Sequence, residues 1–321
     1  MEGTLMALKP IPIATTGGSH TAQQFRMMIR DMARDNQGVT TGLDLKVTAL
    51  ATPGAGVQIS DGSATITGKV SSVQGSYNAY NIGSDTVSVA ATGSTARSDM
   101  LILRVEDPEY EGTRNPATDP IVFWQVVTNV SSSATAVPSG YSAIPLARID
   151  IPANTATITN SMIKDLRRVT NARRERTLYP YYAQDPYVEI SGTSETWKTF
   201  PNVTMANIPI PAWAASAKVV FTICGIRCAD GNVWANFRFM LGTIEAAQWV
   251  AIDDNQGTAA RRSTVQMVET IDLTTTTGAA MRGTTQTLKS RMRTRSSNAG
   301  KIGVDATTTF NIDIEFTEGP L

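Results

Sequence analysis

The sequence predicts a mainly β protein: an N-terminal α+β module, made of one helix and an antiparallel β-sandwich, followed by a jelly-roll-like C-terminal β-sandwich. Apolar residues form 41% of the 321 residues, which is enough to build hydrophobic cores. Charged residues form only 17%, a low share for a helical enzyme. Val and Thr, which favour strands, are abundant. Period-two alternation recurs between Val39 and Ile158 and again in the last third of the chain.

One helix precedes the strands. Thr21 is followed three positions later by Gln24, which is the spacing of a capping box, and Gly38 is the stop signal. Apolar side chains then recur at helical spacing, at Phe25, Met28, Ile29 and Met32. We expect this stripe to be buried in the core or in an oligomer seam.

Short alternating segments follow, separated by turns rich in Gly, Pro and Ser. Asp61-Gly62 predicts a β-hairpin between two of them. Segments 101–105 and 121–127 are apolar on both faces, so we expect them to be central strands. Segment 106–120 holds three prolines and five acids, which indicates an exposed loop.

A second helix is predicted near residues 159–169, capped by Asn160 or Ser161, and it closes the first module with an arginine-rich segment. The arginines are Arg167, Arg168, Arg173, Arg174 and Arg176. Lys+Arg 28 balances Asp+Glu 28 over the whole chain, which argues against a nucleic-acid or membrane-surface role. We expect an ion-paired, partly exposed joint, with partners in the acidic 106–119 loop of a neighbouring subunit.

These signals divide the chain into three parts. Residues 1–176 form an N-terminal module with the first helix and the closing arginine-rich segment, residues 177–187 a linker with four tyrosines and two prolines, and residues 188–321 the C-terminal sandwich. Seven or eight strand-like runs in the last part follow the rhythm of a sandwich or jelly roll.

A catalytic constellation is missing from the sequence. His20 is the only histidine, and neither a nucleophile elbow nor a phosphate-binding glycine loop occurs. Cys224 and Cys228 would lie about 13 Å apart on a strand, too far for a disulfide. Asp253 and Asp254 are interpreted as solvated turn acids. We therefore expect no enzyme activity, cofactor or metal site, and the sequence shows neither a secretory signal nor a membrane span.

Aromatic residues supply the binding candidates. Exposed indole and phenol rings can stack on sugars, whereas buried rings fill cores. We expect contacts with a glycan or receptor from Trp197, Trp213, Tyr181 and Tyr182, and we expect Trp234 and Trp249, which lie in strand-like runs, to be core residues.

Residues 20–175 also carry short motifs in a distinctive order. Arg97-x-Asp99 is followed about fifty residues later by "IPLARIDIPA" and then by Ile163-x-Asp165-x-Arg167. This order resembles the N-terminal module of minor tail and baseplate proteins of long-tailed bacteriophages.

The resemblance implies a virion structural protein at the tail tip or baseplate, assembled in the bacterial host cytoplasm. It would be a homo-oligomer, with a trimer favoured, that contacts other tail or fibre proteins, displays the outer sandwich and has no nucleic-acid partner. The oligomer or joint residues would be Phe25, Met28, Met32, Arg168, Arg173, Arg174 and Arg176. The alternative is a receptor-binding protein that recognises a host surface polysaccharide through its C-terminal domain.

Overall fold

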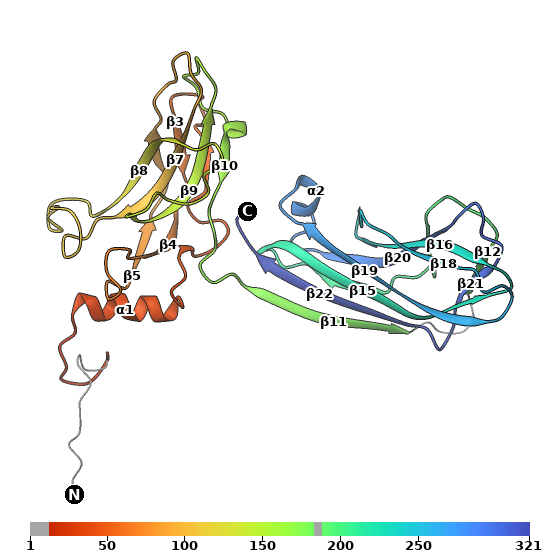
Figure 1. The fold of residues 1–321 in the computed structure, drawn as a ribbon. Coiled ribbons are helices and arrows are strands. Elements are labelled where there is room, and N and C mark those ends of the chain that lie inside the picture. Colours follow the sequence, from red (N-terminus) through yellow and green to blue (C-terminus); the bar gives the residue numbers. More distant parts are fainter. Residues whose placement is uncertain (1–12, 183–187) are drawn as a thin grey trace, which may run out of the picture. The chain divides into compact units, whose positions relative to one another are not determined.

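The computed structural model describes residues 13–182 and 188–321. The chain divides into two compact units, one ending at Ala172 and the other running from Arg173 to Gly319. Both units are mainly β, as the sequence predicts (Figure 1).

Three antiparallel sheets make up unit 1, with strand orders β1-β4-β5, β2-β3-β6 and β10-β9-β7-β8. The elements are α1 (Ala22–Met32), β1 (Gly38–Val39), β2 (Val47–Ala49), β3 (Gly56–Ile59), β4 (Gly62–Thr67), β5 (Ser76–Asn81), β6 (Asp85–Ser88), β7 (Arg97–Val105), β8 (Val122–Val130), β9 (Ser142–Ile151), the 3-10 turn η1 (Asn160–Met162) and β10 (Ile163–Asp165).

The core of unit 1 lies between the four-stranded sheet and the two smaller sheets. Leu101 and Leu103 of β7 pack there with Leu146 of β9 and with Ile59 and Ile66 of the smaller sheets. β7 is central, as predicted, because β9 and β8 pair with its two edges. The prediction for segment 121–127 is wrong: β8 is an edge strand, and its apolar side chains are mostly half-buried.

The hairpin prediction at Asp61-Gly62 is also wrong. β3 pairs with β2 and β6, whereas β4 pairs with β1 and β5, so the chain changes sheets at this turn. Gly62 has a φ of +140°, and a Cβ there would lie 2.5 Å from Cβ of Asp44. The glycine therefore serves a close approach between two segments rather than a two-residue turn.

α1 begins as its sequence predicts. Gln24 N donates to the Thr21 hydroxyl at 3.2 Å, and Thr21 N donates to Gln24 Oε1 at 2.9 Å, which completes the capping box.

The second predicted helix does not form. Asn160–Met162 make a single 3-10 turn, and β10 then pairs antiparallel with β9. Ile163 and Val169 pack against the unit 1 core from extended backbone, so sheet pairing rather than a helix buries the apolar stripe.

Two antiparallel sheets form unit 2. One has the order β11-β22-β15-β21-β12, with β19 also pairing with β15, and the other has the order β13-β20-β16-β17, with β14 on β20 and β18 on β16. The elements are β11 (Arg174–Tyr182), β12 (Val188–Ser191), β13 (Lys198–Thr199), β14 (Ala206–Pro209), β15 (Ala214–Ala229), β16 (Val233–Leu241), β17 (Ile244–Glu245), β18 (Val250–Asp254), β19 (Arg261–Asp272), α2 (Thr276–Ala279), β20 (Thr285–Thr294), β21 (Lys301–Val304) and β22 (Thr309–Glu318).

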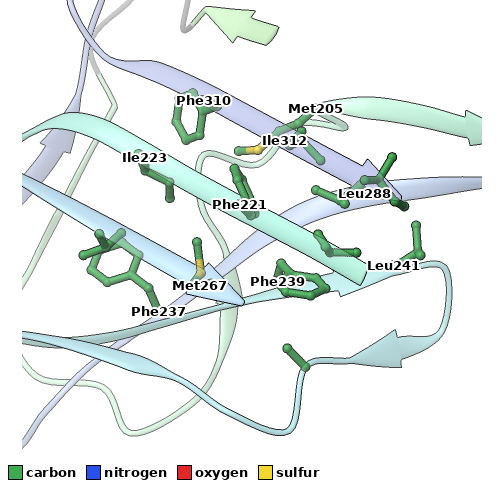
Figure 2. Close-up of a cluster of buried hydrophobic side chains, with 14 of the residues drawn as sticks. Met205, Phe221, Ile223, Phe237, Phe239, Leu241, Met267, Leu288, Phe310 and Ile312 are labelled. Carbon is green, nitrogen blue, oxygen red and sulfur yellow. The ribbon is translucent and has the colours of Figure 1, made fainter. Parts of the chain in front are cut away.

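Unit 2 is a sandwich because the two sheets share one core. Phe221 of β15 lies with its ring centroid 6.4 Å from Phe239 of β16 and 6.3 Å from Phe310 of β22 (Figure 2). Met267 and Met292 are also buried in this core. The β-sandwich is confirmed, and the finer jelly-roll connectivity stays a prediction.

The predicted linker is wrong for residues 177–182. They belong to β11, which pairs with β22 from Arg174 opposite Thr317 to Tyr182 opposite Thr309. Residues 183–187 lie outside the described residues. An edge strand tolerates Pro180, because a missing N–H on its outer side breaks no ladder bond.

Candidate interaction surfaces

The apolar stripe of α1 faces solvent. Phe25, Met28 and Met32 are 45%, 37% and 72% exposed, whereas Gln24 and Arg26 of the same helix are buried. The expectation of core burial is therefore wrong, and the stripe is left as an uncovered apolar ridge on unit 1.

A polar anchor explains this orientation. The Arg26 guanidinium donates to Gln74 O at 2.9 Å and to Glu109 at 2.7 Å, and it lies 3.4 Å from the Asp107 carboxylate. It also stacks 5.2 Å from the ring centroid of Tyr110. The inward face of the helix therefore docks through charge-assisted hydrogen bonds, and its apolar side chains point outward.

The motifs behind the phage-tail resemblance are structural in unit 1. Arg97 Nε lies 2.8 Å from the buried Asp99, which also accepts from Asn129 N at 3.0 Å. Arg167 pairs with Asp165 at 2.7 Å and donates to Asp44 O. The two residues of each pair are two positions apart in the chain, and each pair also bonds to the backbone of another segment, so these residues stabilise the fold of unit 1.

Arg173, Arg174 and Arg176 of the arginine-rich segment form ion pairs within unit 2. Arg173 binds the buried Glu318 at 2.8 Å, and Arg176 Nε donates to Asp313 at 2.8 Å. Arg174 lies 3.9 Å from Glu315. These contacts bridge β11 and β22, and the Arg176 hydrogen bond lowers the pKa of Asp313. The expectation of ion pairing is confirmed.

The expected partners of these arginines are wrong. The acidic loop 106–120 folds onto its own unit, where Glu106 lies 3.3 Å from Arg114 and Glu111 lies 3.6 Å from Arg104. Asp107 accepts from Tyr77 Oη at 2.7 Å, and burial together with this bond raises the pKa of Tyr77. The loop thus contacts both α1 and β7 through its acidic side chains.

Arg168 is exposed beside a groove of about 690 Å³ in unit 1. Leu166, Val137 and Tyr141 supply apolar walls, and Lys69 adds a second cation. Arg168 was predicted to form an ion pair at the joint, but its side chain has no ion-pair partner among the described residues.

The four predicted glycan contacts do not form one site. Trp213 packs against the core with the Arg173 guanidinium 5.1 Å from its ring centroid, at the end of β11 that pairs near Glu318. Tyr181 packs on Phe310 at 5.6 Å, and Tyr182 is exposed at the opposite end of β11. Trp197 belongs to the segment that leads into β13 of the other sheet.

Trp197 instead joins a cluster that the sequence interpretation missed. Its ring lies 6.4 Å from that of Trp249, and the guanidinium groups of Arg238 and Arg293 lie 4.2 and 4.8 Å from its centroid. The core expectation for Trp249 is wrong, since it is 52% exposed. Trp234 is only half-buried and stacks under Arg295 at 5.1 Å.

A sequence signal for this cluster exists. Arg291, Arg293 and Arg295 alternate with Met292 and Thr294, which places three arginines on one face of a strand. In β18, the hydrogen bond from Arg261 at 2.7 Å lowers the pKa of Asp254, which is the opposite of the raised pKa that a general acid needs.

Across residues 13–182 and 188–321, metal-ligating side chains form no group of three or more. In the same residues, neither helix has the length and apolar character needed to cross a membrane.

Neither a protein-family model nor a curated protein matches this chain. The solved structure of infectious bursal disease virus, Gx strain, is 12% identical and covers 88% of this chain and 75% of that one, with a TM-score of 0.27. The VP2 subviral particle of that virus is 13% identical, covering 89% and 78%, at 0.25. BuGH86 with neoagarooctaose is 12% identical, covering 84% and 34%, at 0.24.

Proposed function

We propose that this chain is a non-enzymatic structural component of a bacteriophage virion, in the tail tip or baseplate. It self-associates through α1, with a trimer favoured, and displays unit 2 to other tail or fibre proteins. The outward apolar stripe of α1 carries the proposal, and the motif order of residues 20–175 supports the tail location.

The stripe favours a copy of the same helix as its partner. Fully burying a Phe or Met side chain stabilises a structure by about 1.5–3 kcal/mol, and these three are roughly half exposed. Their burial in a symmetric contact would contribute about 3 kcal/mol per protomer, which is enough to matter once other contacts offset the entropy of association.

The test is the oligomeric state of the full chain, measured by sedimentation velocity and native mass spectrometry. We expect an oligomer for the wild type and a monomer for the triple variant Phe25→Ser, Met28→Ser, Met32→Ser. The dissociation constant should rise by about a hundredfold or more, corresponding to the lost apolar burial.

The matched control changes three exposed apolar residues of unit 1 that lie off the helix: Leu43→Ser, Tyr80→Ser and Ile82→Ser. This variant should assemble like the wild type. A monomeric wild-type chain, or an oligomer that survives loss of the stripe, would contradict the proposal.

The tail location has its own test. Purified virions of the encoding phage should contain peptides of this chain by mass spectrometry, and antibodies against unit 1 should label the tail end in electron micrographs. Virions without the chain would refute the virion role, whatever the outcome for self-association.

A second candidate function is recognition of a host surface glycan by unit 2. The observation that favours it is the exposed indole of Trp249 beside Trp197, because exposed aromatic faces stack on sugar rings. Binding of the full chain to a polysaccharide panel, lost in Trp249→Ala, would support it.

A further inference from the structure

The outer face of the β20-β16 sheet in unit 2 is unusually rich in arginine. Alternation along each strand sends Phe237 and Met292 into the core and their neighbours outward. The register places Arg238 opposite Arg291 and Asn236 opposite Arg293. Like charges directly opposite one another destabilise a sheet unless something offsets them.

Two carboxylates offset only part of this charge. Glu245 contacts both Arg238 and Arg291, the latter at 3.3 Å, and Glu195 lies 3.3 Å from Arg295. Arg293 donates to Asn236 Oδ1 at 3.2 Å and has no carboxylate within 4 Å among the described residues. The face therefore carries four guanidinium groups and two carboxylates, which leaves it positively charged. Arg293 is the arginine that lacks a carboxylate partner.

Two aromatic rings hold the Arg293 side chain in position. The Arg293 guanidinium lies 4.8 Å from the ring centroid of Trp197 and 5.4 Å from that of Trp249. Cation–π contacts hold a guanidinium without using its N–H donors, and Nε of Arg293 alone donates to Asn236, so its terminal N–H groups stay available beside the half-exposed indole of Trp249.

We propose that the face formed by Trp197, Trp249 and Arg293 binds an acidic polysaccharide. A hexuronate ring stacks on Trp249, and its carboxylate accepts hydrogen bonds from Arg293. The inference rests on the second candidate function above and names its ligand class. An apolar sugar face suits the indole, and a planar carboxylate suits the guanidinium fork.

Charge and shape favour this occupant over a nucleic acid. A phosphate backbone needs a row of free cations, whereas Arg238, Arg291 and Arg295 are already engaged by glutamates. One exposed ring beside one uncompensated guanidinium matches one anionic sugar.

The experiment measures binding of the full chain to polygalacturonate and to its methyl ester, which keeps the ring and removes the charge. We expect the acid to bind, the ester to bind about tenfold more weakly, and salt to weaken only the acid. Trp249→Ala should weaken binding of both forms by about tenfold, whereas Arg293→Gln should weaken only the acid.

Controls separate this face from the sequence candidates. Tyr182→Ala and Arg176→Gln, on the exposed strand β11, should leave binding unchanged. Circular dichroism and sedimentation of each variant check that fold and oligomeric state are kept.

Each other outcome overturns the inference in a different way. Equal binding of acid and ester that depends on Trp249 refutes the acidic ligand and keeps the glycan function. Absence of binding to either form and to a neutral polysaccharide panel refutes both. Tighter binding of oligothymidylate through Arg293 would assign the face to nucleic acid, and a changed oligomeric state in Trp249→Ala would assign it to a second copy.

Discussion

Replacing Arg26 with methionine tests why α1 turns its apolar stripe outward. The Arg26 side chain is 10% exposed and the Asp107 side chain 12%. Removing one partner of a buried ion pair costs about 3–5 kcal/mol, because the other charge is left unpaired. Asp107 keeps hydrogen bonds from Tyr77 and from Glu109 N, so we expect about 2–3 kcal/mol here.

Hydrogen exchange read by mass spectrometry resolves the two units in the intact chain. Amides of β7 exchange through global unfolding of unit 1, so a loss of 2–3 kcal/mol should speed their exchange by about 30- to 150-fold. Amides of β15 in unit 2 should exchange as in the wild type. Methionine keeps the packing of the aliphatic stem, so the change reports the lost guanidinium contacts.

The matched control is Arg30→Met on the same face of α1. Arg30 is 33% exposed and contacts Asp35 at 3.2 Å and Ser72 O at 3.0 Å. An exposed pair contributes about 0–1 kcal/mol, so β7 exchange should change less than tenfold. If both variants behave alike, or if Arg26→Met leaves β7 unchanged, then Arg26 is not the anchor of the helix.

Two further predictions concern unit 2. Hydrogen bonds from Arg262 hold the pKa of Asp305 far below its ordinary value. A depressed folded-state pKa gives stability that is present above the unfolded value of about 3.9 and is lost as pH falls through the folded value. The midpoint temperature of thermal unfolding should therefore be higher for the wild type than for Asp305→Asn at neutral pH. The two temperatures should converge in strong acid. Burial raises the pKa of Cys228, so iodoacetamide should modify the half-buried Cys224 first, as read by peptide mass mapping, and Cys228 only on unfolding.

Local signals in the sequence predicted correctly where the relevant interactions are local. The capping box of α1 depends on two residues three apart, and the alternation in β22 depends on neighbours along one strand. The Arg97–Asp99 and Asp165–Arg167 pairs belong to the same class, since each forms within three residues. Such features survive because no distant segment competes for them.

Predictions failed where pairing with another strand overrides the local pattern. Residues 163–165 have apolar spacing compatible with a helix, yet β9 offers them a ladder of hydrogen bonds. Residues 177–182 look like a proline-rich linker, yet β22 pairs with all of them. The hydrophobic period of a segment carries no information about the strand with which that segment pairs.

Local sequence patterns were enough to predict that this protein is mainly β, that α1 starts at its capping box, and that most arginines of segment 167–176 form ion pairs. Which partners these arginines take, and which side chains remain exposed, depends on long-range packing. Alternation assigns a residue to one of two faces, but burial depends on what packs against that face. A buried arginine thus turned an apolar helix stripe toward solvent, and an uncovered sheet face left Trp249 and Arg293 side by side.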